Sequence, residues 1–409
     1  MTACTVVPLS AALHGHDITS NLLASLRPIL EVPGVHVVER VADAKATTPL
    51  ALLLVTGGTE QMALQAWHER QAIAPGEPVL LLTHPEHNSL PAALETLARL
   101  QLDGARGRIV MLQPGAISHE LDDVLRDITV WHGMHRARIG LVGTPSDWLV
   151  ASVPRPGALR DRWGPTLVDV SLPGVMDRFD DNIEAPIAVP VRLAARPADG
   201  TPHPADIETA ARLEPVLRAL TGEQHLDAIA VRCFDLITDA HTSGCLALSS
   251  LNDRGIIAGC EGDVASTVAM LWLKLLLGQP AWMANPAEAN PATGAISLAH
   301  CTVPLSMVSG YRLDTHFESG LGVGIVGDLP AGPVTLVRLG GEELEHLWCV
   351  DGEAVLTTPR SGRCRTQLEV RVAPSAVGTM VDHPLGNHVV VVYGHHADAL
   401  WAWWQEMVA

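Results

Sequence analysis

Tyrosine and phenylalanine are scarce in this chain of 409 residues, with two and three copies. No CxxC pair occurs among the cysteines, whose number is odd and which are widely spaced, at positions 4, 233, 245, 260, 301, 349 and 364. This pattern argues against a disulfide framework and against a thiolate zinc site. We therefore expect reduced thiols and a cytoplasmic protein.

Basic residues are also in short supply. Lysine and arginine number 27 against 45 aspartates and glutamates, which gives a formal net charge of −18. Such a protein repels phosphate backbones and anionic lipid surfaces. The longest apolar stretch, residues 264–277, is shorter than the roughly 20 residues of a membrane span. The N-terminal segment also lacks the basic and apolar regions of a secretory signal. We expect no nucleic-acid or membrane partner.

Several common catalytic and cofactor motifs are missing. Neither Gly57-Gly58 nor Gly143 completes a GxGxxG or Walker pattern, and the chain has no GxSxG elbow and no HExxH helix. Histidine, by contrast, occurs 19 times. Most of these histidines belong on the surface, but the excess makes metal-ligand or proton-carrying roles plausible for a few of them.

Short apolar runs alternate with helical patterns through the first two thirds of the chain. The patterns predict strands at 51–56, 78–83, 108–112, 139–142, 166–171, 227–233 and 255–260. They predict helices at 59–70, 90–100, 207–220 and 264–277. Strands that are apolar throughout and separated by helices indicate parallel sheets covered on both faces. We predict two Rossmann-like or flavodoxin-like layer domains, residues 1–137 and 138–286.

The pattern changes after Pro286. Short β-type runs separated by Gly, Asp and Pro turns appear at 295–303, 323–326, 333–339, 347–350, 364–372 and 389–393, and a tryptophan-rich helix follows at 397–407. This is typical of an antiparallel, barrel-like domain. The predicted fold class is α/β: two parallel-sheet layer domains followed by a β-barrel-like C-terminal domain, residues 287–409.

Candidate chemical groups stand near the ends of these elements. Glu261 directly follows a predicted strand, and Asn285 follows the apolar run 280–284. Because a crossover helix returns the chain to the same sheet edge, we expect both side chains at one edge. His300 lies in the first strand of the last domain, and Asn387-His388 opens its final strand. Glu, Asn and His together suit Mn²⁺, Mg²⁺ or Co²⁺.

Each candidate residue can also be explained by a role in the fold alone. Asp263 precedes a helix and is expected to be its N-cap, and Glu261 favours the positive end of the same helix. Asn285 before a proline suits a turn, and His300 or His388 can be a hydrogen-bonded strand histidine. A plain ion pair between two neighbours accounts equally for Arg232 and Asp235.

Five segments carry a family resemblance. They are CLALSSLNDRGIIAGCEGDVAST at 245–267, PAWMANP at 280–286, LAHCTVP at 298–304, LDTHFESGLGVG at 313–324 and HPLGNHVVVVYGHH at 383–396. Together they resemble the L-fucose isomerase family and its fucose isomerase-like relatives. They are more distantly similar to L-arabinose isomerase, in which an AEGD-type segment corresponds to residues 260–263. The resemblance covers roughly residues 225–400.

The resemblance implies a divalent metal, most often Mn²⁺, with Co²⁺, Mg²⁺ or Fe²⁺ as alternatives. Its ligands match Glu261, Asn285 and His388, and the arabinose isomerase relatives add a histidine at the position of His300. Asn285 stands where the fucose enzymes have aspartate, so a second catalytic carboxylate is expected elsewhere, at Asp235 or Asp263. The resemblance also implies a homotrimer or homohexamer whose active site lies at a subunit interface.

The expected reaction is an aldose–ketose isomerisation of an open-chain sugar through a cis-enediol. The metal polarises the carbonyl, and Glu261 transfers the proton, with Asp235 as a second catalytic group. The remaining candidates are expected to bind the hydroxyls or a terminal group of a deoxy or sulfonated (sulfoquinovose-type) sugar: Trp148, Arg232, His300, His316, Glu318 and Asn387. Two alternatives stay open: a sugar-binding protein without catalysis, and a metal-dependent aldolase.

Overall fold

The protein is described from a computed structural model. The structure describes residues 3–13, 16–30, 34–113, 119–155, 157–179, 183–196 and 202–409. The chain forms two compact units. Unit 1 comprises residues 1–133 and 403–409, and unit 2 comprises residues 134–402. The predicted division into three domains with a boundary at residue 286 stays a prediction.

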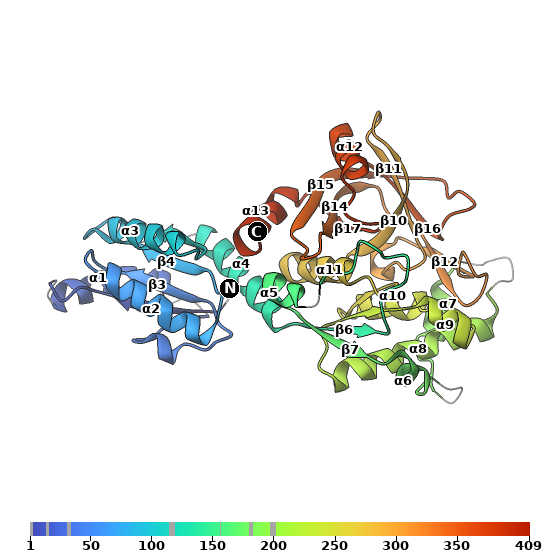
Figure 1. The fold of residues 1–409 in the computed structure, drawn as a ribbon, viewed down its shortest axis with the longest axis horizontal. Coiled ribbons are helices and arrows are strands. Elements are labelled where there is room, and N and C mark those ends of the chain that lie inside the picture. The colour runs from blue at the N-terminus through green and yellow to red at the C-terminus, as the bar shows by residue number, and fades with distance from the viewer. Residues whose placement is uncertain are drawn as a thin grey trace. The chain divides into compact units, whose positions relative to one another are not determined.

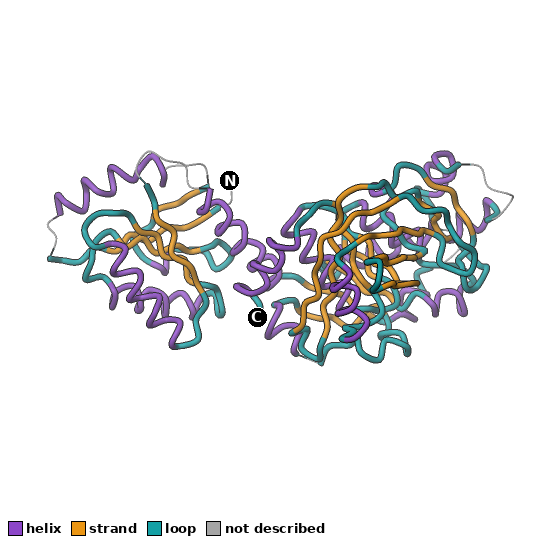
Figure 2. The backbone as a smooth tube through the Cα atoms, turned by 90° about the horizontal axis from the view of Figure 1, so that it is seen from above, coloured by secondary structure: helices purple, strands orange, loops and turns teal. Residues whose placement is uncertain are grey.

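Unit 1 is built on a parallel sheet with strand order β2-β1-β3-β4-β5. Its elements are β1 (Cys4–Leu9), α1 (His16–Leu30), β2 (Val35–Val37), β3 (Leu50–Leu54), α2 (Glu60–Ile73), β4 (Val79–Thr83), α3 (Ser89–Leu102), β5 (Gly107–Met111) and α4 (His119–Arg136), with a short 3-10 turn at Val41–Asp43. Every residue of β3 and β4 is buried, as the continuous apolar runs predict. Helices lie on both faces of this sheet (Figure 2).

The second parallel sheet opens unit 2, with strand order β7-β6-β8-β9. Its elements are β6 (Arg138–Val142), α5 (Ala158–Trp163), β7 (Thr166–Val170), α6 (Leu172–Met176), α7 (Ala188–Ala194), α8 (Pro204–Glu223), β8 (Ala228–Val231), α9 (Phe234–Ala240), α10 (Cys245–Asp253), β9 (Ile257–Gly259) and α11 (Val264–Leu277). Helix α11 contacts β8 and β9 on one side and strands β14 and β17 on the other (Figure 1). This position explains why α11 is apolar on nearly all sides.

A closed antiparallel barrel, β10-β11-β16-β15-β14-β17, follows. Its strands are β10 (Trp282–Asn290), β11 (Ala295–His300), β14 (Gly332–Gly340), β15 (His346–Val355), β16 (Thr366–Arg371) and β17 (Val389–Tyr393), accompanied by helices α12 (Pro374–Asp382) and α13 (Ala397–Met407) and a 3-10 turn at Leu305–Met307. The apolar core includes Trp282, Ile296, Leu336 and Val391. The predicted fold class is therefore confirmed.

Two details differ from the sequence prediction. The run 280–284 leads into a barrel strand, β10, which pairs antiparallel with β17, and not into the central parallel sheet. The predicted strand 323–326 corresponds to β13 (Gly324–Gly327), which pairs with β12 (Tyr311–Asp314) in a separate two-stranded sheet. The partner of β10 lies far away in the sequence, and the partner of β13 is the preceding strand β12, which the apolar pattern did not predict. No helix in the described ranges is long and apolar enough to span a bilayer.

Candidate functional site

The loop that follows β9 carries Glu261 into the interior of unit 2. Asp263 ends this loop and caps α11, because its Oδ1 accepts a 2.8 Å hydrogen bond from the Ser266 N–H. The predicted N-cap is thereby confirmed. Gly262 has a φ of +69°, and a Cβ at this position would lie 2.8 Å from the Thr144 carbonyl oxygen. Only glycine fits such a close approach of two backbones.

Glu261 itself adopts a left-handed conformation, with φ of +63°. Backbone of this kind costs a non-glycine residue about 1 kcal/mol or more. Its carbonyl oxygen accepts from the Ser146 N–H at 2.9 Å, and its own N–H donates to the Cys233 sulfur at 3.4 Å. The surrounding structure therefore holds the residue in a strained position, which fixes the direction of its buried carboxylate.

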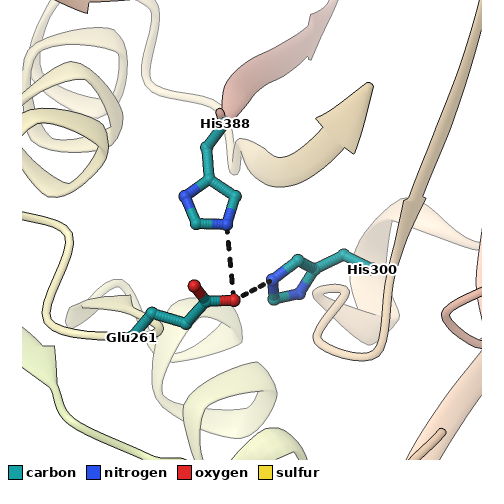
Figure 3. Close-up of side chains that lie close together, drawn as sticks. All are labelled: Glu261, His300 and His388. Atoms are coloured by element: carbon teal, nitrogen blue, oxygen red, sulfur yellow. Dashed lines mark ion pairs between the residues drawn. The ribbon is translucent and has the colours of Figure 1, made fainter. Parts of the chain in front are cut away.

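Two histidines from the barrel face this carboxylate. His300 ends β11 and His388 precedes β17; their Nε2 atoms lie 3.8 and 3.5 Å from Glu261 Oε1. Figure 3 shows both imidazole rings directed at the same carboxylate oxygen. One ligand atom from each of the three residues lies within 4.8 Å of the other two, and all three residues are buried.

This arrangement fits a cation. Ligands at about 2.1 Å from one ion lie about 3 to 4 Å from each other, close to the separations seen here. The His388 Nε2 is buried and has no hydrogen-bond partner in the structure. A buried polar atom without a partner is costly, and a metal ion at this point would satisfy it. Glu261, His300 and His388 can therefore hold a divalent metal.

A chain of buried polar groups orients His388 through its Nδ1 atom. Its Nδ1 lies 2.8 Å from Asp263 Oδ2, and the same oxygen accepts from Arg338 Nη1 at 3.2 Å. Arg338 Nη2 donates to Ser152 Oγ at 2.6 Å. A carboxylate behind a ligating histidine fixes the ring tautomer and strengthens the ligand. Asp263 thus serves both as a helix cap and as the partner of His388.

The ionisable groups in this cluster shift one another's pKa values. Burial alone would raise the pKa of Glu261, but His300 and His388 outweigh it and hold that pKa well below its usual range. Burial also acts to raise the pKa of Asp263, and Arg338 and His388 lower it instead. For His388, burial lowers the pKa but Asp263 and Glu261 outweigh burial and raise it to about 9. Both carboxylates are therefore ionised at neutral pH.

A cavity of about 300 Å³ opens in front of the cluster. Of the residues that the sequence singled out, seven line it: Trp148, Glu261, Asn285, His300, His316, Glu318 and Asn387. The Trp148 Nε1 donates to Glu261 Oε2 at 2.5 Å, and its ring meets Phe234 edge-on at 4.8 Å between ring centroids. One oxygen of Glu261 thus faces the histidines and the other faces Trp148.

Arg232 and Asp235 lie elsewhere: neither is among the described residues that line the cavity. They pair with each other at 2.9 Å, and Arg232 also pairs with Asp147 at 3.2 Å. The Asp147 carboxylate is held by Arg232, which lowers its pKa. Arg232 and Asp235 therefore form the plain ion pair that was the alternative interpretation of these two residues.

Sequence reasoning missed Arg338. Its signal is a lone charged residue in the middle of the apolar strand β14, where it is 3% exposed. A buried charge needs a partner, but the partner, Asp263, is 75 residues away in the chain. The sequence alone could flag the arginine without showing what it holds.

The fold and site define a layered α/β protein with an antiparallel barrel and a buried carboxylate–imidazole cluster at a cavity. The chain is similar to the sulfoquinovose isomerase of Alkalicoccus urumqiensis, with 24% identity over 232 residues, which are 55% of this chain and 52% of that protein. The sulfoquinovose isomerases of Priestia aryabhattai and Priestia megaterium are 25% identical over 182 residues, 42% of this chain and 40% of theirs. The chain thus spans about half the length, or less, of these relatives. No protein-family profile matches it.

Proposed function

We propose that the protein is a metal-dependent aldose–ketose isomerase that acts on an open-chain sugar. The observation that carries the proposal is the buried group Glu261, His300 and His388, whose ligand atoms lie within 4.8 Å of one another at the wall of a cavity. The similarity to proteins named sulfoquinovose isomerase supports the reaction class. The names of these relatives favour a sulfonated sugar, and a deoxy sugar is the alternative from the sequence.

Glu261, His300 and His388 would hold the metal, with the side-chain oxygen of Asn285 available from the same cavity wall. Oxygen and imidazole donors without thiolate ligands suit Mn²⁺, with Co²⁺, Mg²⁺ or Fe²⁺ as alternatives. When bound, the ion polarises the sugar carbonyl and acidifies the neighbouring C–H and O–H groups.

Carboxylates of the chain carry out the proton transfer in this proposal. Glu261 is ionised and fixed by Trp148 and the two histidines, so we assign it the transfer of hydrogen from C2 to C1 through a cis-enediol. The sequence offered Asp235 or Asp263 as a second catalytic carboxylate, and Asp263 is already bound by Arg338 and His388. Because Asp235 pairs with Arg232 away from the cavity lining, we propose Glu318 for this role, since it is the other carboxylate among the described lining residues.

The cavity walls bind the substrate in this proposal. Trp148, Phe234 and His316 form a row of edge-to-face rings, 4.8 and 5.5 Å apart, against which the carbon chain of a sugar packs. Asn387 supplies an amide for its hydroxyls. Burial lowers the pKa of His316, so this imidazole is neutral and both donates and accepts. Arg232 Nη1 donates to the Pro145 carbonyl oxygen at 2.7 Å and to Thr144 Oγ1 at 3.0 Å, so Arg232 is proposed only to support the loop 144–147.

The resemblance described above supports a homotrimer or homohexamer with the active site at a subunit interface, and light scattering coupled to size exclusion tests it. The seven free thiols support a cytoplasmic location.

The test of the proposed reaction is a screen of aldoses and ketoses, including sulfonated and deoxy sugars, in Mn²⁺ and ²H₂O. An isomerase converts one sugar to its isomer and incorporates deuterium at C2 on the return reaction. Cleavage into two shorter fragments would show an aldolase instead. Binding of a sugar without exchange or conversion would show a sugar-binding protein.

A further inference from the structure

Five of the seven cysteines surround the cavity. Cys245, Cys260, Cys301 and Cys364 line it, and Cys233 lies directly behind Cys260. The Cys233 and Cys260 sulfur atoms are 2.8 Å apart, and both residues are buried. This separation is about 0.8 Å longer than a disulfide bond of about 2.05 Å. Both side chains therefore already point at each other.

We propose that Cys233 and Cys260 are an oxidation site that forms a reversible disulfide and thereby weakens metal binding at Glu261. Formation of the bond does not depend on the proposed function; its effect on metal binding does. The oxidant is a peroxide small enough to enter the cavity, such as hydrogen peroxide, and the reductant is a dithiol.

The redox step balances. The sulfur of Cys260, a residue of the cavity lining, attacks one peroxide oxygen and keeps it as a sulfenic acid, while the other oxygen leaves as water with the thiol proton. The Cys233 sulfur then attacks the Cys260 sulfur and displaces hydroxide, which takes the Cys233 proton and leaves as a second water. Two thiols lose two electrons in total, and one peroxide is reduced to two waters.

The connection to Glu261 is short. Cys260 immediately precedes Glu261, and the Glu261 N–H donates to the Cys233 sulfur at 3.4 Å. The Cys260 N–H in turn donates to the Met283 sulfur at 3.3 Å. A bond between the two cysteine sulfurs must draw them together and disturb the hydrogen bond that holds Glu261 in its left-handed conformation. The carboxylate that faces His300 and His388 then moves with it.

The experiment uses the full-length protein, freed of metal, reduced, and then incubated with hydrogen peroxide for hours, because buried thiols react slowly. Free thiols are alkylated under denaturing conditions and the digest is mapped without reduction. The proposal predicts a linked peptide pair containing Cys233 and Cys260 that disappears with dithiothreitol. The rival pairs within the cavity are Cys245–Cys301 and Cys301–Cys364, which are hydrogen-bonded as well. Linkage of either rival, or alkylation of both Cys233 and Cys260, overturns the proposal.

The same samples are titrated with Mn²⁺. Disturbing the support of a ligand typically lowers metal affinity about 10- to 100-fold, and we expect a loss of this size on oxidation and recovery with dithiothreitol. Each variant is compared with its own reduced form, because Cys233→Ser also changes the acceptor of the Glu261 N–H. Peroxide should leave the Mn²⁺ affinity of Cys233→Ser unchanged and should lower that of Cys349→Ser, altered outside the cavity lining, as in the unaltered protein. Unchanged affinity in the linked protein overturns the coupling. If the reduced protein binds no Mn²⁺, the proposed function and the coupling both fail, and the peptide map still decides the thiol pair.

Discussion

At the scale of single residues, the site depends on one glutamate held in an unfavourable backbone conformation. Glu261 is buried with φ of +63°, and its carboxylate divides its two oxygens between the histidine pair and Trp148. A strained residue persists only where its surroundings over-determine it, and such residues cluster at functional sites.

The first prediction concerns this carboxylate. Glu261→Gln keeps the shape of the side chain but removes the charge that the proposed metal binding and proton transfer need. We expect isomerase activity to fall by at least about 10²- to 10⁴-fold and Mn²⁺ affinity to fall with it, while the circular dichroism spectrum stays the same. Glu288→Gln, on the exposed part of β10, is the matched control and should be fully active. Full activity of the Glu261 variant removes this residue from the mechanism.

A second prediction concerns Asp127, a buried carboxylate of unit 1. Burial raises the pKa of Asp127 despite its pairing with Arg126. A carboxyl with a raised folded-state pKa stabilises the protein below its unfolded pKa of about 3.9 and loses that contribution as pH rises through the folded value. The variant Asp127→Asn stays neutral, so its stability relative to the unaltered protein should increase between pH 4 and pH 7. Urea unfolding at both pH values measures this difference.

The control for this prediction is Asp123→Asn on the same helix, because Asp123 also pairs with Arg126 but is exposed. It should show no such gain. A gain that is equal for both variants, or one that shrinks with rising pH, contradicts the assignment.

The sequence assigned the metal to Glu261, Asn285 and His388, whereas the three ligand groups that lie within 4.8 Å of one another belong to Glu261, His300 and His388. Glu261, Asn285, His300 and His388 come from four separate segments; the first three line one cavity, and His388 faces Glu261. Asp235 and Arg232 were placed by their position after a strand, yet their opposite charges satisfy each other locally. Arg338 was missed because what it holds is fixed by tertiary contact alone.

At the scale of secondary-structure elements, the site lies where the central sheet meets the barrel. Glu261 and Asp263 come from the loop between β9 and α11, whereas His300 and His388 come from barrel strands. The buried pair between Arg338 on β14 and Asp263 at the start of α11 connects the two. Removing one partner of a buried pair leaves an uncompensated charge.

The third prediction follows from this connection. Arg338→Met removes the arginine partner of the buried Asp263 and leaves His388 as the remaining ionisable group beside it. We expect this variant to destabilise unit 2 by about 3–5 kcal/mol and to weaken Mn²⁺ binding through His388. Chemical denaturation measures the first effect and calorimetric titration the second. Arg371→Met, on the exposed face of β16, should cost well under 1 kcal/mol. Equal stability of the two variants would mean that the Arg338 pair contributes nothing.

Elements with clear local boundaries were predicted best. The helix at 264–277, the strand at 389–393 and the helix at 397–407 have the predicted limits. Asp263 caps the first of these helices, and Gly278 at φ of +69° ends it, so the signals for start and stop are local. The predicted strand 323–326 was assigned to the barrel from its apolar pattern, but it forms β13 and pairs with β12, a strand that the pattern did not predict.

At the scale of the whole molecule, two parallel α/β sheets and a barrel are predictable because continuous and alternating apolar patterns distinguish them. The similarity to a protein named sulfoquinovose isomerase covers about half of the chain.

The fourth prediction concerns metal removal. A ligand that binds only the folded state at 100 times its dissociation constant stabilises it by about 2.7 kcal/mol. Adding Mn²⁺ to protein treated with a chelator should therefore raise its melting temperature by several degrees, and His388→Ala should abolish the increase. An equal increase in the variant would place the binding elsewhere.

The central claim is that Glu261, His300 and His388 hold one cation. Its most direct test is an anomalous difference map from crystals grown with Mn²⁺. The account predicts a single peak about 2.0–2.3 Å from Glu261 Oε1 and from the Nε2 atoms of His300 and His388. A Mn²⁺ peak bound elsewhere on the chain, with none between these three atoms, would contradict it.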